Sequence, residues 1–179
     1  MKKLALLLLM FLSLCSCKND DSNSNEFNIQ DKTFVITNYI LESSVDLNGD
    51  DIYSHDLLEE GNGCVISELY FRLDDTFGAP NYRSLSLIVN DNQTQTYDCI
   101  EPDGARLTYQ QIDTVVSVTY NDVFYYNGEL SNDNNILTFN IPFEHLYGLS
   151  LFGDNDIIGP DGTIEEYTGG VMAIYERIE

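Results

Sequence analysis

The chain has 179 residues, of which 30 are Asp or Glu and only 8 are Lys or Arg, giving a formal net charge of −22 at pH 7. So acidic a chain repels phosphate backbones, which excludes nucleic acid as a partner, and it repels anionic lipid headgroups too. Its length suffices for one domain with a hydrophobic core.

The chain begins with the pattern of a bacterial secretory signal. Lys2 and Lys3 supply a positive start, residues 4–12 are apolar without interruption, and small residues follow. The apolar run is too short for a transmembrane helix, which needs about 20 apolar residues. We therefore expect residues 1–16 to be a signal peptide that is removed on export.

The segment Leu14-Cys15-Ser16-Cys17 resembles the lipobox of bacterial lipoproteins. In that family an apolar residue stands three positions before the cleavage point, and the Cys that follows cleavage becomes the lipidated N-terminus. Cys17 fits this position, with Leu14 three residues ahead and Ser16 directly before it. The resemblance implies an acylated, palmitate-bearing Cys17 that anchors the protein, since several acyl chains hold a protein durably where one holds marginally.

A polar segment follows the anchor. Residues 18–25 contain no apolar side chain, so we expect residues 17–28 to be the lipidated Cys and a flexible acidic tether. Cys17-Lys18-Asn19-Asp20-Asp21 resembles the surface-export signal of some Gram-negative lipoproteins, with Asn19 interrupting the usual run. That resemblance implies an outer-membrane anchor with display at the cell surface; the periplasmic face is the alternative.

From residue 29 onward the dominant sequence period is two, which is typical of β-strands. Clear alternation of apolar and polar residues predicts strands at residues 65–73, 82–89, 114–120 and 136–141. In the first of these, Val65, Leu69, Phe71 and Leu73 are expected on the buried face. Further strands are expected at residues 33–41, 106–110, 123–130 and 167–178, the last bent at Gly169-Gly170.

Turn signals separate these strands, and only residues 54–60 suggest a helix, a short one. Asn127-Gly128 fits either a hairpin tip or the interior of a longer strand. About eight short strands joined by short turns predict one all-β domain over residues 29–179, an antiparallel sandwich or an up-and-down meander barrel.

The stretch from Val45 to Cys64, VDLNGDDIYSHDLLEEGNGC, resembles the lipocalin-like bacterial lipoproteins. In them an early strand leads to an Asp-Leu-Asn-Gly-Asp segment, a short Leu-Leu turn and a Cys, and a meander ends near a Tyr-Glu-Arg such as Tyr175 to Arg177. The resemblance implies an eight-stranded lipocalin-like barrel. Lipocalins usually open the barrel with a Gly-X-Trp; this chain has no Trp, so Phe34 would fill the barrel base.

Two cysteines remain beyond the lipidated one. Cys64 and Cys99 form an even pair in an exported protein, which predicts a disulfide bond, with two buried free thiols as the alternative.

The sequence contains no clear enzymatic constellation. His55 and His145 lack a paired zinc spacing, and neither a nucleophile elbow nor a phosphate-binding glycine loop occurs. Two carboxylates can hydrolyse a glycoside, but no such pair stands out among 30 acidic residues. We therefore expect no enzymatic activity.

One acidic turn carries a partial calcium-loop pattern. Asp46, Asn48 and Asp50 have the alternating oxygen spacing that opens such a loop, although Asp51 and Leu57 replace its sixth-position Gly and twelfth-position Glu. Residues 154–165 carry a second partial pattern. The alternative is a pair of polar turns. We predict a weak calcium (Ca²⁺) site at Asp46, Asn48 and Asp50, since a cation would relieve repulsion among the acids.

These features favour a non-catalytic, monomeric binding or accessory module at the cell envelope. The twelve tyrosines serve either as ordinary cross-strand contacts or as the lining of a pocket for a small apolar or amphipathic ligand. The alternative is a subunit with a filled core that docks an envelope protein. A carboxylate-dependent hydrolase ranks third.

Overall fold

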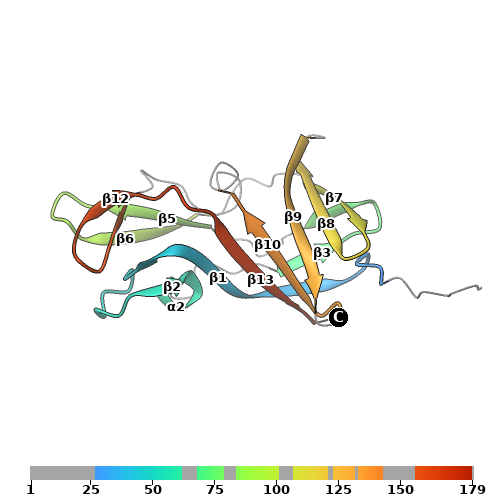
Figure 1. Cartoon of the computed structure of the whole chain (residues 1–179), viewed down its shortest axis with the longest axis horizontal. Helices are drawn as coiled ribbons and strands as arrows, with labels where there is room; N and C mark the ends of the chain where they lie inside the picture. Colours follow the sequence, from blue (N-terminus) through green and yellow to red (C-terminus); the bar gives the residue numbers. More distant parts are fainter. Residues whose placement is uncertain are drawn as a thin grey trace, which may run out of the picture.

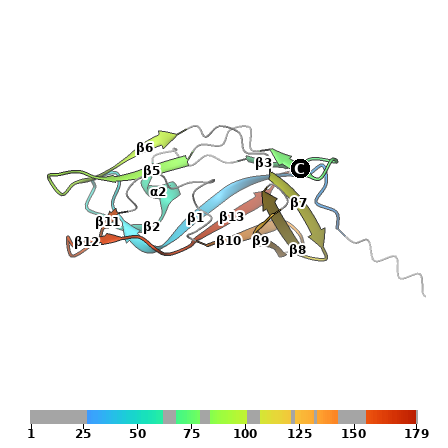
Figure 2. The same cartoon turned by 90° about the horizontal axis from the view of Figure 1, so that it is seen from above.

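The computed structural model describes residues 27–61, 68–78, 84–100, 107–120, 123–131, 133–142 and 156–178. In this part of the chain the regular structure is antiparallel β-strand apart from one short helix, which confirms the prediction of an all-β fold (Figures 1 and 2). The signal, Cys17 and most of the predicted tether lie outside the described residues.

The strands are β1 (Thr33–Val45), β2 (Ser54–Asp56), β3 (Glu68–Phe71), β4 (Thr76–Gly78), β5 (Ser84–Val89), β6 (Gln95–Ile100), β7 (Leu107–Ile112), β8 (Val115–Tyr120), β9 (Val123–Ser131), β10 (Ile136–Ile141), β11 (Asp156–Ile158), β12 (Ile164–Glu166) and β13 (Val171–Arg177). The helix is α2 (Leu57–Glu60).

Nine strands form one sheet in the order β13-β10-β9-β8-β7-β4-β3-β1-β2. From β3 to β13, sheet neighbours follow one another along the chain, which makes the arrangement a meander. The hairpin β5-β6 is inserted between β4 and β7, and the hairpin β11-β12 between β10 and β13. Strand β13 also pairs with β1.

Strand β1 is longer than predicted and changes its buried side partway along. Phe34 and Ile36 are buried before the irregularity and Tyr39 and Leu41 after it, so the alternation shifts by one residue. The register with β13 shifts at the same place, between Ile36 and Asn38, as a β-bulge requires. The bulge lets β1 remain continuous along the molecule while its apolar residues follow the core (Figure 1).

The predicted helix at residues 54–60 is half wrong, because Ser54–Asp56 forms β2 beside β1. Asp56 explains the change. Its Oδ1 accepts hydrogen bonds from the Tyr39 backbone N–H at 3.0 Å and from the Leu58 N–H at 3.0 Å. The carboxylate therefore fixes the strand to β1 and caps the helix that begins at Leu57.

The predicted strand over residues 65–73 is too long at its C-terminal end, and the placement of Leu73 on the buried face is wrong. Strand β3 ends at Phe71, and Leu73 is 73% exposed. The chain turns here because Asp74 Oδ1 accepts hydrogen bonds from the N–H and the hydroxyl of Thr76, at 3.2 and 2.5 Å. Asp75 then adopts a positive φ of 59°, which Asp tolerates. Val65 lies outside the described residues.

The last predicted strand starts later than expected. Tyr167 precedes β13, and its hydroxyl donates to the Gly170 carbonyl and accepts from the Glu42 N–H at 3.2 Å. These bonds hold Gly169-Gly170 as an irregular entry to the strand. Four short strands lacked a sequence prediction: β4, β6, β11 and β12.

The core lies on the inner face of the meander. On β10 the predicted alternation is confirmed, with Leu137, Phe139 and Ile141 buried. Asn127-Gly128 lies inside β9, which settles that alternative in favour of a longer strand. A Cβ at Gly128 would stand 2.5 Å from Phe139 Cε1, so the glycine gives the ring its space.

Edge-to-face aromatic contacts run through this core. The pairs, by distance between ring centroids, are Phe71–Tyr109 at 4.9 Å, Tyr126–Phe139 at 5.4 Å, Phe34–Phe71 at 5.8 Å and Phe139–Tyr175 at 5.9 Å. Phe34 is fully buried. Such pairs add stability beyond the area that they bury.

Candidate functional site

Residues 27–32, here called the N-terminal strap, lie across one end of the sheet before β1 begins. Ile29 is fully buried in the core. The Asp31 N–H donates to the Phe71 carbonyl at 2.7 Å, and the Phe71 N–H donates to the Lys32 carbonyl at 3.0 Å. The Phe27 ring lies 5.0 Å from the Arg177 guanidinium carbon. The strap therefore belongs to the folded body.

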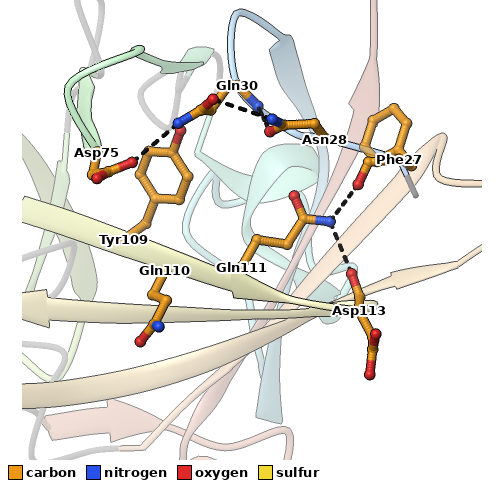
Figure 3. A pocket seen from close by; sticks show the side chains of 8 residues that line it. All are labelled: Phe27, Asn28, Gln30, Asp75, Tyr109, Gln110, Gln111 and Asp113. Carbon is orange, nitrogen blue, oxygen red and sulfur yellow. Dashed lines mark hydrogen bonds between the residues drawn. The ribbon is translucent and has the colours of Figure 1, made fainter. Parts of the chain in front are cut away.

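Gln111, on β7, holds the strap in place with its whole amide group. Its Oε1 accepts from the Ile29 N–H at 2.8 Å, and its Nε2 donates to the carbonyls of Phe27 at 2.7 Å and Asp113 at 2.8 Å. Figure 3 shows this amide between the strap and the β7–β8 turn. A side chain with both of its ends bonded has one orientation, which makes this region rigid.

A cleft of about 530 Å³ opens between the strap, the β3–β4 turn and the β7–β8 hairpin. Its lining is mostly amide and carboxylate, with two aromatic residues: Phe27, Asn28, Gln30, Asp75, Tyr109, Gln110, Gln111 and Asp113. No Lys or Arg is among these lining residues. The cleft is thus polar, preformed and free of positive charge at its wall.

A relay of side-chain hydrogen bonds forms one wall of the cleft (Figure 3). Asn28 Nδ2 donates to Gln30 Oε1 at 3.1 Å, and Gln30 Nε2 donates to Asp75 Oδ1 at 3.1 Å. Asn28 Oδ1 also accepts from the Gln30 N–H at 2.8 Å. Each amide is therefore oriented by its neighbour.

Tyr109 forms the floor of the cleft. Its hydroxyl donates to the Arg72 carbonyl at 2.9 Å. Burial, and after it the negative charge of Asp75, raises the pKa of Tyr109 to about 12, with a hydrogen bond from Gln30 acting in the opposite direction. The hydroxyl is consequently protonated, and a donor, at any physiological pH.

The predicted calcium residues do come together in one turn after β1. Asp46 Oδ1 accepts from the Gly49 N–H at 2.7 Å and Asp46 Oδ2 from the Asp51 N–H at 3.0 Å. Asn48 Oδ1 accepts from the Asp50 N–H at 2.9 Å. The oxygens thus cap the backbone of their own turn, as Asx-turns do. Because each oxygen keeps further lone pairs, calcium binding stays a prediction.

The buried carboxylate of Glu60 supports this turn from below. It is 2% exposed, and its Oε2 accepts from the Leu47 N–H at 3.0 Å. Within the described ranges, no group of three or more His, Cys, Asp or Glu side chains is arranged to hold a metal ion.

The predicted disulfide falls partly outside the described residues. Cys64 lies in one of the undescribed segments, and for Cys99 only its backbone position on β6 is described, opposite Leu85. The Cys64–Cys99 bond therefore stays a prediction. Among the described residues, no helix is long and apolar enough to span a bilayer.

The cleft residues were missed from the sequence, because they come from three segments that are distant along the chain. Gln30 and Asp75 stand 45 positions apart, and Gln111 lies 82 positions from Ile29. An Asn or Gln in a polar stretch carries no local signal of its partner.

None of the family models, curated proteins or solved structures compared with the chain matches it.

Proposed function

We propose that this chain is a lipid-anchored, non-catalytic accessory module of the bacterial cell envelope, exported by residues 1–16 and held by acylated Cys17. The lipobox resemblance supports the anchor. Phe27 is bonded to Gln111 in the folded body, and a tether of about ten residues between Cys17 and Phe27 would reach at most roughly 35 Å from the membrane. The proposed site is the outer membrane, with display at the cell surface.

We further propose that the eight meander strands form a lipocalin-like, up-and-down barrel. The pairing of β13 with β1 supports this arrangement, because it joins the first and last strands of the meander by hydrogen bonds. The resemblance over residues 45–64 supports the same family type.

The observation that carries the functional choice is the packing of the core. An apolar or amphipathic ligand inside a small barrel needs an empty interior of a few hundred cubic ångströms. The buried residues of the meander instead meet ring against ring, with Phe139 between Tyr126 and Tyr175. This packing favours the alternative of a filled body, which recognises its ligand or partner on its outer surface.

The polar cleft gives no support to the hydrolase alternative. Glycoside hydrolysis needs two carboxyl groups that face each other across the scissile bond, about 5–10 Å apart. Figure 3 shows the Asp113 carboxylate pointing away from that of Asp75, and Asp75 is held by Gln30. The arrangement suits binding without bond cleavage.

Native mass spectrometry of the acylated chain, purified from membranes in mild detergent, tests this function. We expect the mass of the acylated protein alone. A bound apolar molecule that persists through exchange between two detergents would contradict the filled body and restore the interior-ligand function.

A further inference from the structure

We propose that the polar cleft between the N-terminal strap, the β3–β4 turn and the β7–β8 hairpin is a binding site for an uncharged carbohydrate. The inference rests on the proposed function of a module that binds at its surface. It adds the place of binding and the chemical class of the ligand.

The size and rigidity of the cleft suit a small ligand. Its volume of about 530 Å³ falls within the 300–1,000 Å³ typical of ligand sites. The strap wall is tied to Gln111 by two hydrogen bonds and through buried Ile29 to the core. A wall that is already ordered costs little conformational entropy when a ligand binds.

The relay leaves donors and acceptors beside one another along the wall. In Asn28 and Gln30, each amide nitrogen has two N–H groups and donates one of them within the relay. Asp75 engages its Oδ1 with Gln30, and its Oδ2 remains an acceptor. Neighbouring hydroxyls of a sugar both donate and accept, so alternating amide and carboxylate groups match them.

The charge of the cleft excludes other ligand classes. Asp75 and Asp113 line it and no basic side chain does, so phosphates and carboxylates are repelled. An apolar ligand would remove water from the amides of the wall without replacing their hydrogen bonds, so its binding is unfavourable. An uncharged polyhydroxylated molecule meets neither penalty.

Asn140 on β10 supplies a control with the same kind of side-chain amide. It is exposed and is not among the residues that line the cleft. Asn140→Ala therefore removes an amide group, as Gln30→Ala does, without touching the relay or the cleft.

The test is binding of the full acylated chain, in a sugar-free detergent, to an array of uncharged oligosaccharides and to spermidine as a cationic probe. We expect at least one oligosaccharide to bind. Gln30→Ala should weaken that binding about tenfold, as expected for the loss of one or two hydrogen bonds, and Asn140→Ala should leave it unchanged. Asn28→Trp, a substitution at an exposed position, should block it by filling the cleft, which covers the case that Gln30→Ala perturbs the strap.

Three results would overturn the site: no oligosaccharide bound, spermidine bound in place of any sugar, or equal binding by wild type, Gln30→Ala and Asn28→Trp. Failure of the proposed function is separate, because a retained apolar ligand in the mass spectrum contradicts the filled body whatever the array shows.

Discussion

At the scale of single residues, the fold depends on a glycine that makes room for a ring. Gly128 on β9 lies opposite Phe139 on β10. A Cβ there would stand 2.5 and 2.6 Å from two atoms of the Phe139 ring. Phe139 is 2% exposed and contacts two further aromatic rings, so it has no space into which it can move.

Gly128→Ala should therefore lower the free energy of unfolding by about 1–3 kcal/mol through overpacking. Phe139→Ala should lower it by about 3–5 kcal/mol through the cavity that it leaves. Because the alanine methyl would occupy part of that cavity, the double variant should lose less than the sum of the two. Urea unfolding of the four proteins measures this difference, and strict additivity would show that the two residues do not compete for space.

Tyr109 makes stability depend on pH in the alkaline range. Its pKa is about 12 in the folded protein and 10.0 when unperturbed. Between these values the unfolded chain loses its proton first, so the free energy of unfolding should fall as pH rises from about 10 to about 12. At pH 7, Tyr109→Phe should lower the free energy of unfolding by about 1 kcal/mol, because the hydrogen bond to the Arg72 carbonyl is lost. This difference in stability between the variant and wild type should shrink above pH 10. Denaturation curves of both proteins at pH 7 and above pH 10 measure the difference in stability. A difference that stays constant would contradict the shifted pKa of Tyr109.

At the scale of elements, local sequence predicted strands well where both faces had distinct chemistry. On β10, the alternation correctly predicted all three buried residues. It failed at Leu73, whose apolar side chain continues the pattern beyond a turn that Asp74 and Asp75 impose. It also failed at residues 54–56, where a strand forms because the carboxylate of Asp56 reaches a backbone N–H on β1. That contact joins distant residues and leaves no trace in a local period.

The turn after β1 is the element that tests calcium binding. If Asp46, Asn48 and Asp50 bind the ion in the millimolar range typical of extracellular modules, about 10 mM calcium should raise the melting temperature by mass action. Asp50→Asn should reduce that rise while preserving the Asx-turn bond to the Ile52 N–H. Melting curves in excess calcium and in chelator provide the measurement. Identical curves would leave this segment as a self-capped turn.

At the scale of the whole molecule, the sequence predicted the all-β fold class but could not locate the cleft. Fold class follows from repeated alternation, which is a local property. The cleft depends on Gln111 meeting Ile29, and on Gln30 meeting Asp75, which only the pairing of β1 with β3 and of β4 with β7 brings about. Whether the core is filled or hollow was likewise undecided from the sequence, because tyrosines on strands suit a pocket and a packed interior equally.

Anchoring is the first whole-molecule prediction. Cys17→Ala should abolish acylation and leave the protein unprocessed or unanchored, because the mature chain is too acidic to bind anionic headgroups by itself. Metabolic labelling with an alkyne fatty acid reports the modification. Label that persists in Cys17→Ala would place the anchor elsewhere, and Cys15→Ala, which should label normally, serves as the control.

The central claim is that the body is filled and binds at its surface. It is tested most directly by titrating the mature chain, made without its signal and with Cys17→Ala to avoid detergent, with the uncharged fluorescent probe N-phenyl-1-naphthylamine. A lipocalin with an open cavity serves as the positive control. The packed rings of Phe139 and its neighbours predict no saturable rise in fluorescence. A saturable, one-to-one rise would mean that the body encloses an apolar cavity and would contradict the claim.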